Sequence, residues 1–176
     1  MSTKIINLMI FITYIIMATV LIMNIYIWFN DFSPSGLGLF LADRIRANPD
    51  LYSLGFQHSI IGAILSSIPI VFLIRILHST NVLYRSVIEM KIFSASNVIR
   101  LKKLSILILY WSLSDIVVVP ITSYILTYGN PPGDRLIMLS FSWGQFLGLY
   151  LSGFIYILSI IIKNGFNIKL DYDNII

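Results

Sequence analysis

One acidic residue, Asp115, stands within a long apolar stretch and is the side chain best placed to do chemistry. It lies about eleven residues into that stretch, which in a helix corresponds to the centre of a bilayer. A carboxylate at that depth is costly unless it faces protein. Hydroxyl groups occur at similar depth in other apolar stretches, on Ser66, Ser67, Tyr150 and Ser152. The pattern predicts either a proton or cation site at the midplane or a hydrogen-bonded group that holds helices together.

A row of small residues, Gly144, Gly148 and Ser152, has the spacing that lets another helix backbone approach closely. We expect this row to serve helix packing inside the same chain, with homo-oligomer formation as the alternative. An earlier stretch offers a small-residue surface that could face the row, formed by Gly62, Ala63 and Ser66.

The residue sets that carry out known membrane catalysis are missing from the sequence. The chain has no cysteine, which excludes thiol catalysis and thiolate metal sites. A serine-type intramembrane protease needs a Ser and a His at matching depth, and an aspartyl type needs two acids, but Asp115 has no such companion. Phosphate-binding glycine loops and His-Glu-x-x-His sequences are also missing. We therefore expect no enzyme activity, no catalytic residues, no cofactor and no metal.

The composition indicates a membrane protein. Of the 176 residues, 57% are hydrophobic and 11% are charged, whereas soluble domains have about a quarter of their residues charged. The net charge of +4 comes from basic residues that flank apolar stretches rather than from a basic domain. We therefore expect contact with the lipid bilayer and no direct binding of nucleic acid.

Four apolar stretches are long enough to cross about 30 Å of hydrocarbon as helices. They predict an all-α integral membrane four-helix bundle, residues 1–176, in one membrane domain. Pro69 and Pro120 fall inside the second and third spans, where membrane helices tolerate proline. The predicted spans are residues 5–29, 58–77, 104–126 and 139–162.

The connection between the second and third spans, residues 78–103, is rich in basic residues and is termed the hinge. Apolar residues spaced by four and three continue the second helix to about Met90, and Ser94 has the character of an N-cap for the next helix. These features predict a helical hairpin. Its basic residues either set the topology and touch anionic lipid head groups or bind a partner. The candidate contacts are Arg85, Phe93, Asn97, Arg100, Lys102 and Lys103.

The distribution of Lys and Arg predicts the orientation, because cytoplasmic loops carry the excess of these residues. Nine of the 12 fall on one side of the predicted spans: Lys4, Arg75, Arg85, Lys91, Arg100, Lys102, Lys103, Lys163 and Lys169. The other three are Arg44, Arg46 and Arg135. Both termini and the hinge are therefore expected in the cytoplasm.

From Leu73 onward the chain resembles a family of small bacterial four-span membrane proteins, domain of unknown function 2975. The resemblance is carried by Met90-Lys-Ile-Phe-Ser-Ala-Ser-Asn-Val-Ile-Arg-Leu-Lys-Lys-Leu104 and by the ending Asp171-Tyr-Asp-Asn-Ile-Ile176. It implies a four-span protein of the bacterial inner membrane without established activity. Members are often encoded beside a small helix-turn-helix regulator, which implies a cytoplasmic partner of that kind.

Three functions are compatible with these features. The first is a regulatory or interaction protein that binds a cytoplasmic partner through the basic hinge. The second is a small transport or channel subunit that uses Asp115 as a midplane site. The third is an immunity-type membrane protein, which no residue pattern supports or excludes.

Overall fold

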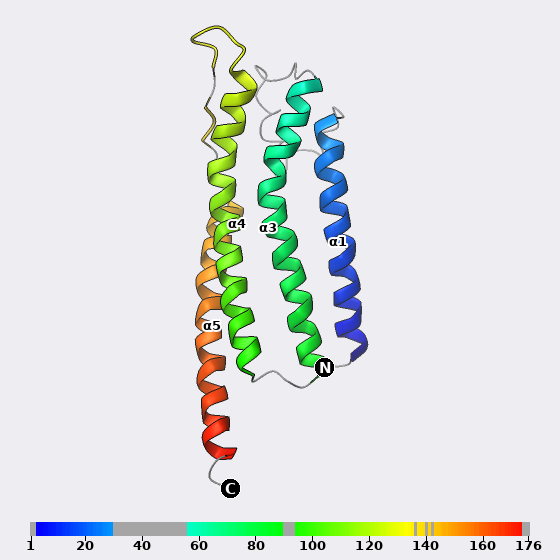
Figure 1. The fold of residues 1–176 in the computed structure, drawn as a ribbon, viewed down its shortest axis with the longest axis vertical. Coiled ribbons are helices and arrows are strands. Elements are labelled where there is room, and N and C mark those ends of the chain that lie inside the picture. The colour runs from blue at the N-terminus through cyan, green and yellow to red at the C-terminus, as the bar shows by residue number, and fades with distance from the viewer. Residues whose placement is uncertain are drawn as a thin grey trace.

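The computed structural model of the 176-residue chain describes residues 3–29, 56–89, 94–135, 137–139, 141 and 143–173, with side chains up to Ile168. These residues form four helices and, within the described ranges, no strand. The prediction of an all-helical fold is confirmed. The helices are α1 (Thr3–Phe29), α3 (Phe56–Ile88), α4 (Ala95–Thr127) and α5 (Trp143–Asp173) (Figure 1).

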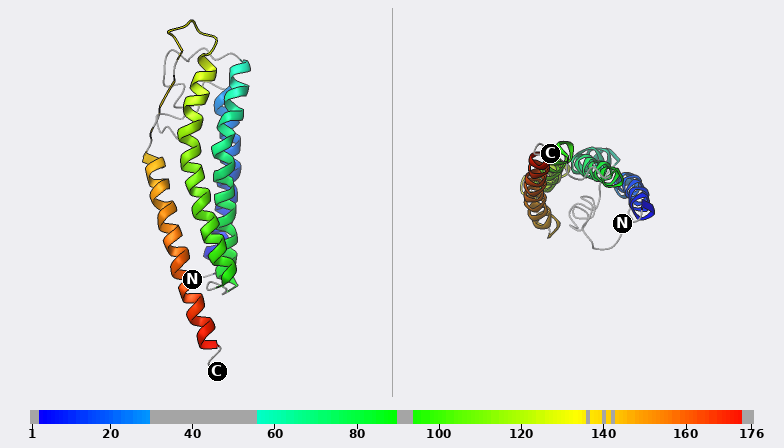
Figure 2. Two further views of the ribbon diagram at one scale, coloured as in Figure 1. Left: turned by 60° about the vertical axis from the view of Figure 1, so that its left-hand side comes forward. Right: turned by 90° about the horizontal axis from the view of Figure 1, so that it is seen from below.

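The helices run alternately up and down, and each packs chiefly against the helix next to it in the chain. The main contacts are α1 with α3, α3 with α4, and α4 with α5. Seen end on, the four helices follow an arc in that order (Figure 2). The start of α1, the end of α3, the start of α4 and the end of α5 all lie toward one end of the molecule. This end is called the hinge end below.

All four helices are long and apolar enough to cross a membrane. The second helix continues past its predicted span as expected and ends at Ile88, while Met90 is outside the described residues. The third begins at Ala95 after an N-cap at Ser94, whose side chain accepts a hydrogen bond from the backbone N–H of Asn97. This confirms the predicted cap.

The fourth helix begins at Trp143, so the predicted start at Leu139 was wrong. Residues 137–139 and 141 are not helical. This segment makes tertiary contacts instead: the backbone N–H of Met138 donates a hydrogen bond of 2.9 Å to the hydroxyl of Ser123 on α4, and its side chain packs against the hydrophobic cluster described below.

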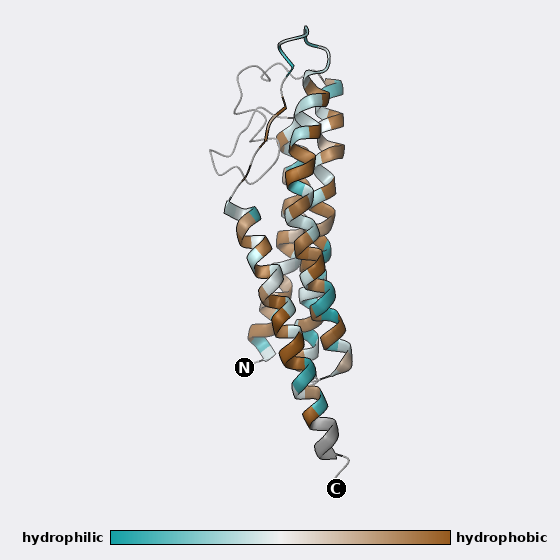
Figure 3. Cartoon of the chain, turned by 90° about the vertical axis from the view of Figure 1, so that its left-hand side faces the viewer, coloured by the Kyte–Doolittle hydropathy of each residue, from teal (hydrophilic) through white to brown (hydrophobic). Residues whose placement is uncertain are grey.

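The interior is small and partly polar, whereas the outer surface is apolar. One hydrophobic cluster contains Ile27, Trp28, Val118, Val119 and Leu126. Many other buried side chains carry hydroxyl or amide groups, and large aliphatic and aromatic side chains are exposed along every helix. Figure 3 shows the hydropathy of the residues, with hydrophobic residues along all the helices. A surface of this kind requires an apolar solvent, because soluble proteins rarely expose large apolar areas. The chain is a multi-pass membrane protein.

Candidate functional site

The contact between α1 and α3 contains a chain of hydrogen bonds. The indole Nε1–H of Trp28 donates to Ser66 Oγ at 2.9 Å, and the Ser66 hydroxyl donates to Asn24 Oδ1 at 2.8 Å. The Asn24 amide in turn donates to Ser67 Oγ at 3.5 Å. Gly62 makes room for the ring, since a Cβ at that position would overlap the Trp28 indole. Polar side chains thus join the two helices where water is not available to pair them.

The contact between α4 and α5 is polar at two levels. Near the start of α5, the Gln145 amide donates to Asp115 Oδ2 at 3.0 Å, and Gln145 is only 4% exposed. Two turns further along, the Ser152 hydroxyl donates to the backbone carbonyl of Ser105 at 2.8 Å. Gly148 lies between these bonds, packed so closely on α4 that a Cβ would overlap the hydroxyl of Ser112.

The hydroxyl residues predicted at a depth similar to that of Asp115 are distributed over different helix pairs. Ser66 and Ser67 belong to the α1–α3 contact, and Ser152 bonds to the backbone of α4. Tyr150 is 71% exposed and lies on the outer face of α5. Asp115 accepts a hydrogen bond from the amide of Gln145, a residue absent from the predicted set.

Part of the predicted row of small residues packs against another helix. Gly148 and Ser152 are buried against α4, whereas Gly144 is exposed. Gly62 and Ser66, which offered one possible surface for this row to face, instead face Trp28 and Asn24 of α1. Small residues permit close approach to any helix, so their spacing does not identify which helix approaches.

The polar residues that we missed share one sequence signal. Asn24, Gln145 and Trp28 each place a hydrogen-bonding side chain within an apolar stretch, and each is at most 4% exposed. The predicted set contained carboxylates, hydroxyls and small residues at that depth, and no amide or indole group. An amide has both donors and acceptors, so it joins helices as readily as a carboxyl group does.

A side-chain amide also holds the hinge end together. Asn97 is 4% exposed, and its Nδ2 donates to Ser86 Oγ of α3 at 2.9 Å. Its Oδ1 accepts a hydrogen bond of 3.5 Å from Arg100, which is half-buried. Asn97, a candidate contact from the sequence, therefore links α3 to α4. Three other candidate contacts are exposed, Arg85, Lys102 and Lys103. The amine nitrogen of Lys102 lies 5.9 Å from the ring centroid of Tyr156. Phe93 is outside the described residues.

Comparison with known proteins identifies the family. Residues 46–176 match the family described as protein of unknown function (DUF2975). The chain belongs to this family. The matched region contains α3, α4, α5 and the hinge, so the resemblance found at residues 90–104 is confirmed. No curated protein and no solved structure matches the chain.

In this DUF2975 member the bond between Asp115 and Gln145 provides a test of what the acid does. Asp115→Asn keeps an oxygen that can accept the Gln145 N–H, so we expect the melting temperature in detergent to stay close to that of the wild type. Asp115→Leu removes this acceptor from a buried amide and should lower the stability by about 1 kcal/mol. Thermal unfolding of the purified variants measures both effects.

A matched control is Leu113→Asn, which places an amide on the same helix at a residue that is 42% exposed. It changes the polarity of α4 without touching the α4–α5 bond. If Asp115→Leu melts at the temperature of the wild type, or if Asp115→Asn is as damaging as Asp115→Leu, the amide bond does not stabilise the contact.

Proposed function

We propose that this protein is a bacterial inner-membrane protein that binds a cytoplasmic partner protein through the hairpin at its hinge end. The length of α3 and α4 carries this proposal. Each helix has 33 residues, whereas about 20 residues cross the hydrocarbon. On the hinge side, 13 residues of α3 follow Arg75 and nine residues of α4 precede Leu104, where its apolar stretch begins.

The extended part of the hairpin has the rigidity that a docking surface needs. The Asn97–Ser86 bond ties the two helices together, and Ser94 caps the start of α4. A surface that is already ordered loses little conformational entropy on binding. This supports a hairpin that presents a preformed surface.

The exposed surface of the hairpin combines basic and apolar groups. Arg85 and Lys102 are exposed, and Ile99 and Val87 are 56% and 37% exposed. A partner that complements this surface would carry acidic groups around an apolar contact. The family resemblance implies a small helix-turn-helix regulator as one such partner.

The basic residues support a cytoplasmic location for the hairpin and both termini. Lys4, Arg85 and Lys163 belong to helix segments at the hinge end, as the predicted orientation requires. Arg135 follows the opposite end of α4. The proposed orientation therefore places the 128–135 turn outside the cell.

Cysteine labelling tests the orientation, since the chain has no cysteine of its own. Ser96 and Asp134 are both exposed, at opposite ends of α4. In intact spheroplasts, a membrane-impermeant maleimide should label Asp134→Cys at once, and Ser96→Cys only after the membrane is opened. Labelling of Ser96→Cys from outside would refute the proposed orientation.

Photocrosslinking in cells tests the proposed docking surface. A photoreactive residue at Ile99 should capture a soluble cytoplasmic protein, whereas the same residue at Val117, which is exposed within the span of α4, should not. Adding Arg85→Glu should weaken the capture about fivefold, because the charge pairs would become repulsive. The amount of crosslinked product on a gel is the measurement.

Lys163→Glu is the matched control, since it makes the same charge change at an exposed site on α5 rather than on the hairpin. It should leave the capture unchanged. Equal products from Ile99 and Val117, or equal losses from Arg85→Glu and Lys163→Glu, would argue against docking at the hairpin.

A further inference from the structure

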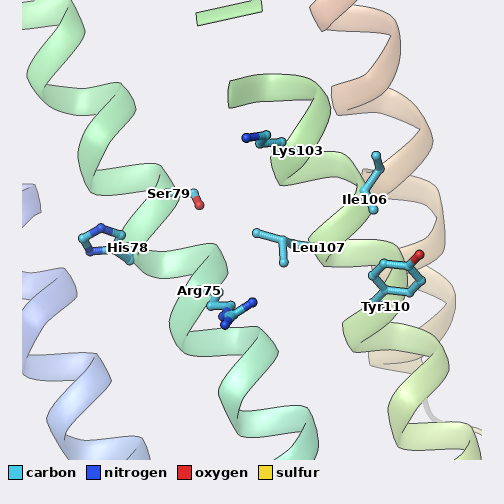
Figure 4. Close-up of a pocket in the computed structure, with 7 residues that line it drawn as sticks. All are labelled: Arg75, His78, Ser79, Lys103, Ile106, Leu107 and Tyr110. Carbon is cyan, nitrogen blue, oxygen red and sulfur yellow. The ribbon is translucent and has the colours of Figure 1, made fainter. Parts of the chain in front are cut away.

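A groove between α3 and α4 lies on the membrane side of the hairpin. Its volume is about 330 Å³. Arg75, His78 and Ser79 line it from α3, and the lining residues of α4 include Lys103 and Tyr110. Figure 4 shows Arg75 and Ser79 of α3 and Lys103 of α4 around the space between the two helices.

The groove is suited to an anion. Arg75 and Lys103 are both exposed, and among the described residues no carboxylate lines the groove. Neither cation has an ion pair with the described part of the chain. The hydroxyl of Ser79 adds a hydrogen-bond donor to the two charges. A phosphate group accepts hydrogen bonds from donors of this kind, two cationic side chains and a hydroxyl.

The depth of the groove matches the boundary between head groups and hydrocarbon. From Phe56 to Ile74, α3 has no Asp, Glu, Lys or Arg, and these 19 residues are close to the length of about 20 that crosses the hydrocarbon. On α4 the apolar stretch starts directly after Lys103. The two cations therefore lie near the ends of the apolar parts of both helices, and Figure 4 shows their side chains pointing into the space between α3 and α4.

The remaining lining of the groove is apolar, and Figure 4 shows Leu107 between the levels of Lys103 and Arg75, with Tyr110 farthest from Lys103 along α4. Ile106 and Leu107 line it, together with the ring of Tyr110, which lies 6.0 Å from the ring of Phe72 between centroids. Ile106 and Tyr110 are 40% and 52% exposed. A small soluble phosphate would leave this wall uncovered, whereas a molecule with a phosphate at one end and an acyl chain at the other contacts both parts.

We propose that this groove binds an anionic phospholipid by its phosphate head group, with Arg75 and Lys103 at the phosphate and an acyl chain along Ile106, Leu107 and Tyr110. The inference depends on the level of the groove in the bilayer and does not depend on a protein partner. In this proposal Arg75 and Lys103 form a specific lipid site, in addition to the general attraction of basic residues to an anionic membrane surface.

Native mass spectrometry of the full chain released from mixed micelles tests this proposal. Wild type should retain phosphatidylglycerol in preference to phosphatidylcholine at equal concentration. The double variant Arg75→Gln/Lys103→Gln should retain at least about tenfold less phosphatidylglycerol, since each basic residue near the head groups contributes to anionic lipid binding. Size-exclusion profiles establish that the variants are folded.

Two matched variants separate a site from general charge. Lys4→Gln/Lys163→Gln removes the same charge from exposed positions outside the groove and should retain the lipid. Arg75→Lys/Lys103→Arg keeps both charges and should retain it as well. Equal lipid loss from the groove variant and the Lys4→Gln/Lys163→Gln variant would overturn the proposal, as would equal retention of the two lipids by wild type.

Glycerol phosphate, which has the phosphate but no acyl chain, tests whether the ligand is a lipid. In excess it should displace phosphatidylglycerol only weakly from wild type. Complete displacement would overturn the lipid assignment and indicate a site for a soluble phosphate compound.

Discussion

Trp28→Ala is expected to cause the largest loss of stability of any single substitution considered for this protein. Trp28 is 0% exposed and belongs to the cluster that joins α1 to α4 residues Val118 and Val119. Its removal leaves a cavity and takes a donor from Ser66. Truncation of a buried aromatic side chain costs about 3–5 kcal/mol in protein interiors. The purified variant should unfold at a clearly lower temperature in detergent than the wild type.

Trp143→Ala is the matched control, because Trp143 is 89% exposed and the substitution deletes the same atoms. It should change the melting temperature little. Trp28→Phe divides the effect of Trp28 into two parts, since it keeps an aromatic ring but removes the N–H donor. We expect it to lose about 1 kcal/mol, an ordinary interhelical hydrogen bond in a membrane. If Trp28→Ala and Trp143→Ala unfold alike, Trp28 does not form the core of the α1–α3 contact.

Gly148→Val should separate α5 from α4. A Cβ at residue 148 would overlap Ser112 Oγ, and Ser112 is 1% exposed with its hydroxyl donating to the Ile108 carbonyl at 3.0 Å. The serine therefore has little freedom to move away. Inserting methyl groups into a packed contact costs about 1–3 kcal/mol, which for a chain of this size lowers the melting temperature by about 2–12 °C. Thermal unfolding followed by tryptophan fluorescence measures the change.

Gly153→Val provides the control on the same helix. A Cβ at Gly153 would meet nothing within 4 Å, so the added atoms enter open space. Both substitutions replace a helical glycine with valine, and the helix propensity changes equally in both. The difference between the two melting temperatures therefore reports the α4–α5 contact. Equal values would show that Gly148 does not determine how closely these helices pack.

The four helices could be predicted because their causes are local. Long uncharged stretches must form helices in lipid, where every backbone polar group needs a partner within the segment. The N-cap at Ser94 was likewise readable, since a cap depends on residues three positions apart. The start of α5 was missed because an apolar stretch does not show where its helix begins, and the contact of Met138 with Ser123 joins residues 15 positions apart.

The candidate site was predictable only as a set of residue types. The cost of a carboxylate at depth indicated that Asp115 would need a partner, and the spacing of Gly148 and Ser152 indicated a close helix contact. The partners themselves depend on how each helix is rotated and which helix lies beside it. Ser66 was predicted at the depth of Asp115, and it bonds to Asn24 and Trp28 because α3 turns that side toward α1.

The sequence by itself determined that this is a four-helix membrane protein with a basic hinge. Whether a side chain is more stable in lipid or in water depends mainly on its own type, so the apolar and basic stretches can be assigned without the tertiary structure. Only the tertiary structure decided that Asp115 meets Gln145, that Gly148 meets Ser112, and that Arg75 and Lys103 share one groove. An apolar helix surface matches lipid and many other helices almost equally well, so close packing and a few hydrogen bonds between distant residues select the arrangement.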